Sequence, residues 1–265
     1  MFRKIPDWVL YALILGGIFF YASYLRDRID APPPPTDLGP LLPSETPKDE
    51  QVITRVAEPR SGIGTAFSLD DRGLWLTARH VVDSCDQVGL KITNQKIIRA
   101  EVEVYEDHDL ARLRTQWRRQ PLPHDVLSQR SIGETGYFIG FPQGRPGEAV
   151  GSLIARNRMV VRGRYSAEES VLAWAETGRT SGLRGSLGGL SGAPVLDKDG
   201  EVIGVVTAEN PRRGRIYSVA PRALIPFYPE ESGDPEPVPH NNYGLQADKL
   251  RRDRRIAQVL CFVDN

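Results

Sequence analysis

Residues 188–208 read GGLSGAPVLDKDGEVIGVVTA, and this stretch says more about the fold than any other part of the chain. It contains two short apolar runs, Ala193–Asp197 and Val202–Thr207, which follow a glycine-rich loop around Ser191. Runs of this length that are rich in valine and bounded by turn residues are typical of β-strands. The stretch therefore predicts two β-strands that follow a serine loop.

Similar short runs, separated by glycine, aspartate and proline, continue from about Gln51 to Pro229. About twelve such runs with regular turn residues predict an all-β domain, either a sandwich or two six-stranded antiparallel β-barrels at about 51–130 and 131–229. The expected strands are Gly64–Leu69, Leu74–Thr77, Gln87–Ile92, Ile97–Tyr105, Leu110–Arg114, Gly136–Phe141, Ala149–Ala155, Met159–Arg164, Val171–Glu176, Ala193–Asp197, Val202–Thr207 and Ile216–Ala220.

The composition excludes several classes of function. Basic and acidic side chains balance at 34 each, so nothing in the net charge favours nucleic acid as a partner. Two cysteines and four scattered histidines fit no zinc motif and no disulfide-dense scaffold. We therefore expect no metal and no cofactor, and a core held by hydrophobic burial.

Trp8 to Leu25 is a run of eighteen residues without a charge. A helix of this length spans about 27 Å, close to the hydrocarbon thickness of a bilayer. The run predicts a transmembrane anchor within residues 1–30, and a cleavable signal peptide is the alternative. Basic residues flank both ends equally, so the positive-inside rule gives almost no information on the orientation of the helix. A single N-terminal anchor usually leaves the following domain outside the cytoplasm, so we expect a periplasmic domain.

Two segments outside the β-rich region have a different composition. Residues 31–50 contain four consecutive prolines and predict a semi-stiff spacer. Residues 230–265 predict a tail with a short basic helix, whose apolar stripe would be Leu250, Ile256, Val259 and Leu260. Its basic run is either a solvated helix face or a contact for anionic lipid or a partner.

Three polar residues suggest a chemistry. His80 follows the expected strand Leu74–Thr77, Asp109 precedes the strand Leu110–Arg114, and Ser191 lies in the glycine-rich loop. A serine hydroxyl needs a base within hydrogen-bond reach, and that base needs a carboxylate to fix its tautomer. Each residue alone has an ordinary structural interpretation, but their order in an all-β chain predicts a catalytic triad. Gly189 and Ser191 would supply the N–H groups of an oxyanion hole.

The order and the surrounding motifs resemble the trypsin-like serine proteases, especially the bacterial HtrA/Deg-type branch. The resemblance covers roughly residues 62–221 and rests on colinear motifs: SGIGTAF at 61–67, TARHVV at 77–82, DLARL at 109–113, GFP at 140–142 with VGSLI at 150–154, and GEVIGVVTA at 200–208. It implies two chymotrypsin-like barrels with the site between them. It also implies an endopeptidase that acts on proteins or peptides through an acyl-enzyme on Ser191.

The chain departs from the family pattern at the serine motif. Leu190 replaces a polar residue and Ala193 a glycine, and the stretch 180–188 is long and glycine-rich. We expect this loop to order when substrate binds. Gly185 lies where trypsin carries an acidic specificity residue. With Gly185, Thr207 and Ala208 beside the substrate, we expect cleavage after small or apolar residues.

Two further expectations follow from the resemblance. The residues after Pro229 are too few for the PDZ domain that HtrA-type proteins usually append, so we expect none. A disulfide often secures the histidine loop in the broader family, and Cys261 is the only partner for Cys85. That pair is either a disulfide or two free thiols. The competing function is a catalytically silent, protease-like module that binds peptides; a scaffold without a site would make the triad a coincidence.

Overall fold

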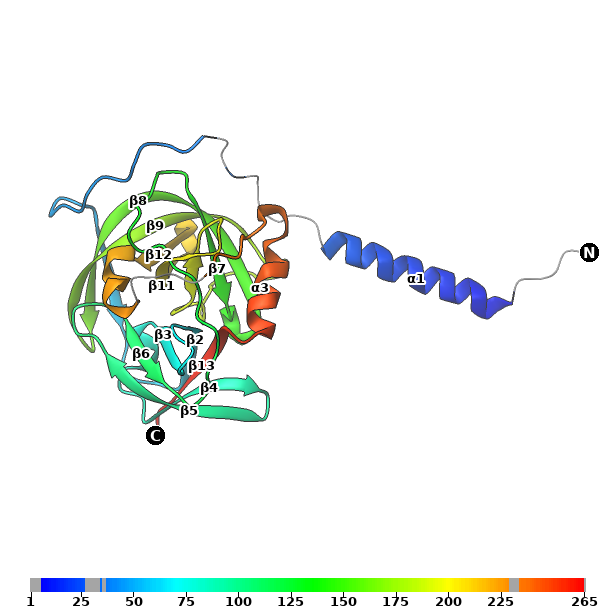
Figure 1. Cartoon of the computed structure of the whole chain (residues 1–265), viewed down its shortest axis with the longest axis horizontal. Helices are drawn as coiled ribbons and strands as arrows, with labels where there is room; N and C mark the ends of the chain where they lie inside the picture. Colours follow the sequence, from blue (N-terminus) through cyan, green and yellow to red (C-terminus); the bar gives the residue numbers. More distant parts are fainter. Residues whose placement is uncertain (1–5, 27–33, 35–36, 229–233, 265) are drawn as a thin grey trace, which may run out of the picture.

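The structure is a computed structural model of the chain, and it describes residues 6–26, 34, 37–228 and 234–264. Most strands belong to two barrels that pack side by side (Figure 1). The helical elements are α1 (Asp7–Arg26), α2 (Arg79–Val82), α3 (Tyr243–Arg252) and short 3₁₀ turns at Pro142–Gly144, Pro211–Arg213, Pro221–Phe227 and His240–Asn242.

The first barrel is closed by six strands in the order β13-β2-β3-β6-β5-β4. Stacked Trp75 and Trp117, with ring centroids 5.2 Å apart, belong to its core. Its strands are β2 (Gly62–Ser68), β3 (Leu74–Thr77), β4 (Gln87–Thr93), β5 (Lys96–Val104), β6 (Ala111–Arg114) and β13 (Ile256–Phe262).

The second barrel is a seven-stranded sheet in the order β1-β8-β7-β10-β11-β12-β9, in which β9 also pairs with β8 and so forms a ring. Phe138 and Trp174 pack edge to face inside it. Its strands are β1 (Gln51–Val56), β7 (Thr135–Gly140), β8 (Gly147–Gly163), β9 (Ala167–Arg179), β10 (Pro194–Leu196), β11 (Val202–Asn210) and β12 (Arg215–Val219).

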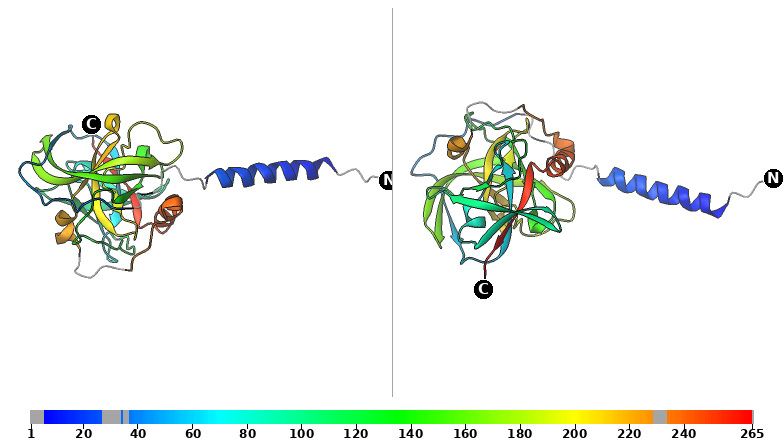
Figure 2. Two further views of the ribbon diagram at one scale, coloured as in Figure 1. Left: turned by 90° about the horizontal axis from the view of Figure 1, so that it is seen from above. Right: turned by 60° about the horizontal axis from the view of Figure 1, so that its bottom comes forward.

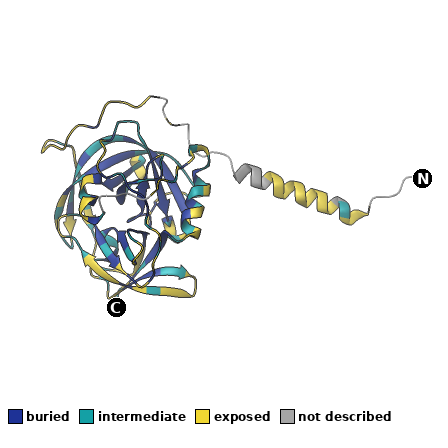
Figure 3. Ribbon diagram, in the orientation of Figure 1, coloured by how far each residue is buried: buried dark blue, intermediate teal, exposed yellow. Residues whose placement is uncertain are grey.

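A shared apolar cluster joins the two barrels. Phe67 and Leu76 of the first barrel belong to the same buried cluster as Ile139 and Val205 of the second. Figure 3 shows the buried residues along the inner faces of both barrels. The predicted all-β fold is confirmed for the closed six-stranded first barrel. The second predicted six-stranded barrel corresponds to the ring β8-β7-β10-β11-β12-β9, to which β1 is added as a parallel seventh strand beside β8.

The predicted C-terminal helix is wrong in its second half. α3 ends at Arg252, Arg254 takes a left-handed φ of 58°, and Ile256–Phe262 forms β13 between β2 and β4 (Figure 2). The stripe Ile256, Val259 and Leu260 is therefore part of a strand. Without β13 the facing edges of β2 and β4 would have no partner, so pairing that joins distant segments outweighs the local helical pattern.

The sequence analysis also omitted β1 and divided β8. Gln51–Val56 alternates between exposed and half-buried side chains and pairs in parallel with Arg158–Gly163 of β8. It lies in the sheet of the second barrel, although residues from 51 on were expected in the first. The strands expected at Ala149–Ala155 and Met159–Arg164 form one strand, because β8 continues without a break between them.

The N-terminal segment is helical from Asp7 to Arg26, and most of its described side chains are exposed. Among the described residues, the structure contains no helix whose length and hydropathy would suffice to span a membrane. The membrane anchor stays a prediction. Residues 27–33 and 35–36 of the expected anchor end and spacer, and residues 229–233 at the start of the expected tail, lie outside the described residues.

Candidate active site

His80 and Asp109 meet as the sequence predicts. His80 lies on α2, directly after β3, and Asp109 lies two residues before β6, which pairs with β3. His80 Nδ1 is 2.7 Å from Asp109 Oδ2, and the backbone N–H of His80 donates to Asp109 Oδ1 at 2.9 Å. The two contacts fix both the position and the ring orientation of His80.

Two residues of the second barrel also hold the Asp109 carboxylate. The hydroxyl of Tyr165, in the turn between β8 and β9, donates to Oδ1 at 2.9 Å. The hydroxyl of Thr207 on β11 donates to Oδ2. Asp109 is only 2% exposed, so these bonds compensate for the loss of water around its charge. The second barrel thus fixes the position of a carboxylate that belongs to the first barrel.

The charges of this pair reinforce each other. Burial by itself would lower the pKa of His80, but the negative charge and hydrogen bond of Asp109 outweigh it and raise that pKa. Burial by itself would raise the pKa of Asp109, but the charge and hydrogen bonds of His80, with the bond from Thr207, lower it. Asp109 is therefore ionised and stabilises a proton on His80.

A second buried carboxylate supports the backbone of the site. Glu169 on β9 accepts the N–H of Asp109 at 3.2 Å and lies 3.4 Å from Nδ1 of His108. Burial raises the pKa of Glu169, and its contact with His108 raises the pKa of that imidazole. The expected motif at 109–113 contained Asp109, but Glu169 lies 60 residues after Asp109 and was not predicted.

The serine loop is held by packing and by two glycines. Leu190 is 1% exposed and lies in the core of the second barrel, so the apolar residue before Ser191 anchors the loop from below. Gly192 has a φ of +83°, and a Cβ there would lie 2.2 Å from the carbonyl oxygen of Thr65. Gly189 has a φ of +97°, and a Cβ there would lie 2.6 Å from the Phe141 carbonyl oxygen. Only glycine fits these two positions.

The peptide before Gly189 has a defined orientation. The carbonyl of Gly188 accepts a 2.5 Å hydrogen bond from the backbone N–H of Gln143. Because C=O and N–H point in opposite directions across a trans peptide, the N–H of Gly189 points away from Gln143. Within the described part of the chain, neither Gly189 N nor Ser191 N donates to a protein acceptor. The first barrel supports the loop through Thr65, whose hydroxyl donates to the Gly189 carbonyl at 2.8 Å.

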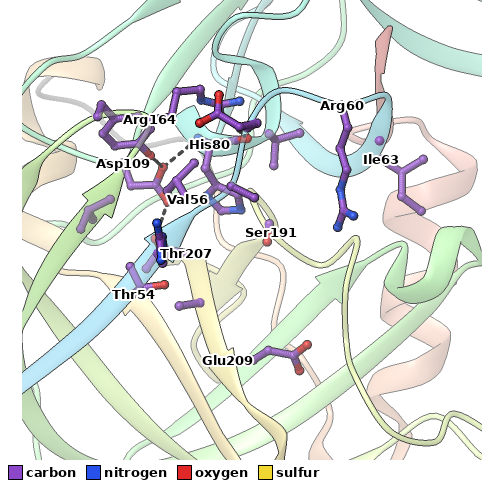
Figure 4. A pocket seen from close by; sticks show the side chains of 18 of the residues that line it. Thr54, Val56, Arg60, Ile63, His80, Asp109, Arg164, Ser191, Thr207 and Glu209 are labelled. Atoms are coloured by element: carbon purple, nitrogen blue, oxygen red, sulfur yellow. Dashed lines mark hydrogen bonds and ion pairs between the residues drawn. The ribbon is translucent and has the colours of Figure 1, made fainter. Parts of the chain in front are cut away.

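The triad residues line one pocket of about 640 Å³ (Figure 4). Thr207, Ala208 and Glu209 of β11 form one wall, as expected for Thr207 and Ala208. Gly185 was expected beside the substrate, but it is not among the residues that line this pocket. Ser191 Oγ makes no hydrogen bond within the described residues, so the pocket holds His80 and Ser191 without a bond between them.

Three polar side chains tie the loop 180–188 in place. Glu209 accepts the hydroxyl of Ser186 and, at 2.8 Å, the N–H of Leu187. Gln143 donates from Nε2 to the carbonyls of Arg184 at 2.6 Å and Ser186 at 2.8 Å. Arg179 donates to the Gly185 carbonyl at 2.8 Å. Glu209 and Arg179 lie at the ends of strands and Gln143 in a turn, where a single polar residue forms no recognisable sequence pattern.

The structure pairs Cys85 with Cys261 in a disulfide, with their Cα atoms 5.6 Å apart. Of the two alternatives that the sequence left open, the structure contains the bonded one. The bond joins the loop after α2, which carries His80, to β13.

One group of carboxylates in the described residues is close enough to suggest a cation site: Asp125, Asp197 and Glu201. The guanidinium of Arg130 already pairs with Asp125 and lies 3.8 Å from Asp197. An arginine side chain thus already pairs with two of the three carboxylates.

The family follows from a direct match. A model of the trypsin-like peptidase domain matches residues 64–205, which is more than half of the 265 residues. The chain belongs to the trypsin-like peptidase family, as the sequence motifs predicted. No curated protein matches significantly.

Similar solved structures come from bacterial proteases. One is the HtrA-type protease AlgW with a decapeptide, at 19% identity, TM-score 0.49, and coverage of 61% of this chain and 49% of that one. Another is an inactive form of a serine-to-alanine mutant of Rv3671c from M. tuberculosis H37Rv, at 18% identity, TM-score 0.49, and coverage of 60% and 80%. A third is the inactive form of the Rv3671c protease, at 19% identity and TM-score 0.48, with coverage of 60% of this chain and 82% of that one. The chain thus spans about half the length of AlgW.

Proposed function

We propose that the chain is a serine endopeptidase that forms an acyl-enzyme on Ser191. The observation that carries the proposal is the 2.7 Å contact between His80 Nδ1 and Asp109 Oδ2, in the same pocket as Ser191. Asp109 holds the proton of His80 on Nδ1, so Nε2 is left free as a base for the serine hydroxyl.

The reaction follows from these positions. Ser191 Oγ attacks the substrate carbonyl carbon while its proton moves to His80 Nε2. The tetrahedral intermediate collapses when that proton passes to the leaving nitrogen and the C–N bond breaks. Water, deprotonated by His80, then attacks the ester, and Ser191 recovers its proton. Asp109 stabilises the imidazolium at each stage and stays ionised, in agreement with its lowered pKa.

The oxyanion would be bound by the N–H groups of Gly189 and Ser191. The contact of Gly188 with Gln143 supports this role, because it turns the Gly189 N–H away from Gln143. Each donor that stabilises such an oxyanion contributes about 3–4 kcal/mol to the transition state.

The acyl half of the substrate would pair with the edge of β11 at Thr207–Glu209. β10 pairs with β11 only as far as Val205, so this edge has no partner strand on that side. Glu209 spans from β11 to Ser186 and Leu187, and no residue of 180–188 lines the pocket. We propose that this contact of Glu209 limits the recess beside Ser191 to small or apolar side chains.

We also propose that the N-terminal helix anchors the domain at a membrane, with the domain on the periplasmic side. The apolar side chains of α1 support this, since Leu13, Phe19 and Phe20 are 69%, 77% and 76% exposed. Fractionation of cells that express the full chain, and extraction of the membranes at high pH, test the anchor. Recovery of the full chain in the soluble fraction contradicts it.

Hydrolysis of a peptide library tests the proposed function. Wild type should cleave peptides at internal bonds, and Ser191→Ala and His80→Ala should lose this activity while they keep the far-ultraviolet circular dichroism of wild type. The rival function, a silent module, predicts that folded wild type binds peptides without cleaving any of them.

A further inference from the structure

One side of the pocket is formed where the chain passes from β1 into the first barrel. Residues 54–58 and 60–63, here called the wall segment, comprise the end of β1, most of the connection after it and the start of β2, and they line the pocket that contains Ser191 (Figure 4). They contribute two basic residues, Arg55 and Arg60, and one acidic residue, Glu58. The segment thus places an excess of one positive charge beside the proposed site.

The backbone of the wall segment is held at both ends. At its start, Val56 is paired with Gly163 in the parallel contact of β1 with β8. At its end, Gly62 is paired with Cys261 of β13, and Ser61 Oγ exchanges hydrogen bonds with the backbone of Val263 at 3.0 and 3.3 Å. The position of Arg60 is therefore defined by its neighbours, which reduces the entropy cost of using its side chain for binding.

The guanidinium of Arg60 is available for a ligand. Within the described residues it has no ion pair and no side-chain hydrogen bond, and it points into the pocket toward the level of Ser191 (Figure 4). Two other charged residues of the pocket, Arg164 and Glu209, bind protein groups. Arg164 donates to the carbonyl of His80 at 3.1 Å, and Glu209 holds the loop 180–188.

The end of the wall segment that carries Arg60 and Ile63 lies on the other side of Ser191 from Thr207 of β11 (Figure 4). Ile63 approaches Gly189, since a Cβ at Gly189 would lie 3.3 Å from Ile63 Cδ1. A substrate whose acyl half pairs with Thr207–Glu209 would carry its leaving half past the wall segment. Arg60 would then meet a side chain that follows the scissile bond.

We infer that Arg60 selects substrates that carry a carboxylate side chain, Asp or Glu, within the first few residues after the scissile bond. The inference rests on the proposed function, because it assumes that β11 binds the acyl half. An exposed pair of opposite charges changes an affinity modestly, so we expect a preference of about 5-fold over the neutral isostere.

Paired peptides test the inference. Each pair has the same sequence and differs only in Glu or Gln at the first, second or third residue after the cleaved bond, and kcat/KM is measured for both. Wild type should favour Glu at one of these positions by about 5-fold, and the ratio should fall as salt is added. Arg60→Ala should bring the ratio to about one, and Arg60→Glu should bring it below one, in favour of Gln.

Arg72→Ala is the matched control. Arg72 is an exposed arginine whose side chain pairs only with Asp71, remote from the pocket lining, so the Glu/Gln ratio should stay at the wild-type value. Equal rates for Glu and Gln at all three positions, or a Glu preference that survives Arg60→Glu, overturn the inference.

Binding separates this inference from the proposed function. The anisotropy of fluorescein-labelled Glu and Gln peptides is measured with Ser191→Ala and with the double variant that also carries Arg60→Glu. Wild type could cleave neither peptide while the Ser191→Ala variant binds the Glu peptide more tightly and loses this preference with Arg60→Glu. That result would contradict the protease function but would support the selectivity of Arg60. If neither assay shows a preference for Glu while wild type still cleaves peptides, the proposed selectivity of Arg60 is wrong and the proposed protease function stands.

Discussion

The hydroxyl of Tyr165 donates a 2.9 Å hydrogen bond to Oδ1 of Asp109 and so connects the β8–β9 turn of one barrel to the carboxylate that pairs with His80 in the other. The ring of Tyr165 lies under the guanidinium of Arg79, 3.9 Å from the ring centroid, which fixes its orientation. Tyr165 is thus a positioning residue, since it acts on His80 only through Asp109.

Tyr165→Phe should weaken both the fold and the activity. The variant keeps the ring over Arg79 but removes one hydrogen bond to a buried charge, and such bonds contribute about 1.5–3 kcal/mol. We expect the free energy of unfolding in urea to fall by about that amount and kcat to fall while KM changes little. Tyr217→Phe is the control, because its hydroxyl makes no hydrogen bond within the described residues. Equal effects of the two changes contradict the role of Tyr165.

The pH dependence of kcat/KM should have its acidic limb above the ordinary histidine value of about 6.5. Only the neutral imidazole accepts the serine proton, and the pKa of His80 is raised by Asp109, so activity should appear as the pH rises through that higher pKa. A limb centred below the ordinary value contradicts the ionised Asp109.

The same ionisations make the stability depend on pH. Because the pKa of His80 is raised by folding, its contribution is fully present below about pH 6.5 and is lost as the pH rises through the folded-state pKa. Because the pKa of Asp109 is lowered, its contribution is present above its ordinary value of about 3.9 and is lost as the pH falls through its folded-state pKa. Urea denaturation of wild type and Asp109→Asn across these ranges measures both.

Glu209 should control access to the loop 180–188. In Glu209→Ala the ties to Ser186 and Leu187 are lost, so larger apolar side chains should be accepted before the scissile bond. Glu209→Gln keeps a carbonyl oxygen that accepts from Leu187 N and should retain the preference for small residues. A peptide library with a varied residue before the cleaved bond measures the change. An unchanged profile in Glu209→Ala shows that this side chain does not limit the recess.

The Cys85–Cys261 bond should stabilise the first barrel. It closes a sequence separation of 176 residues and ties β13, which closes the barrel, to the loop after His80. Loss of a disulfide that closes a long loop costs about 3–5 kcal/mol. We expect that decrease in urea denaturation of Cys85→Ser/Cys261→Ser, with no further effect of a reductant on the double variant. Equal stability of wild type with and without a reductant contradicts the bond.

The sequence predicted the parts of the site that repeat a local pattern. His80, Asp109 and Ser191 each adjoin a strand with a clear apolar run, so their order could be interpreted before any contact was known. Tyr165, Glu169 and Gln143 were missed because each acts across the fold. Glu169, for example, meets the N–H of Asp109 through pairings that bring β9 beside a segment 60 residues earlier.

The strands that were missed have the same cause. β1 is half exposed and is held as a strand by its pairing with β8. Ile256–Phe262 follows a basic helix and is held as a strand by its pairing with β2 and β4. Local propensity is weak at such edges, and the partner strand decides the outcome. By contrast, Leu190 departs from the family motif but is explained by burial, since its side chain packs into the second barrel.

The most direct test of the central claim is the chemical state of Ser191. Folded wild type is treated with a fluorophosphonate, digested and analysed by mass spectrometry, with Ser191→Ala and His80→Ala treated in parallel. The account predicts one adduct, located on Ser191 Oγ, that is absent from Ser191→Ala and strongly reduced in His80→Ala. Folded wild type without an adduct, or an adduct that persists in Ser191→Ala, would contradict the assignment of Ser191 as an activated nucleophile.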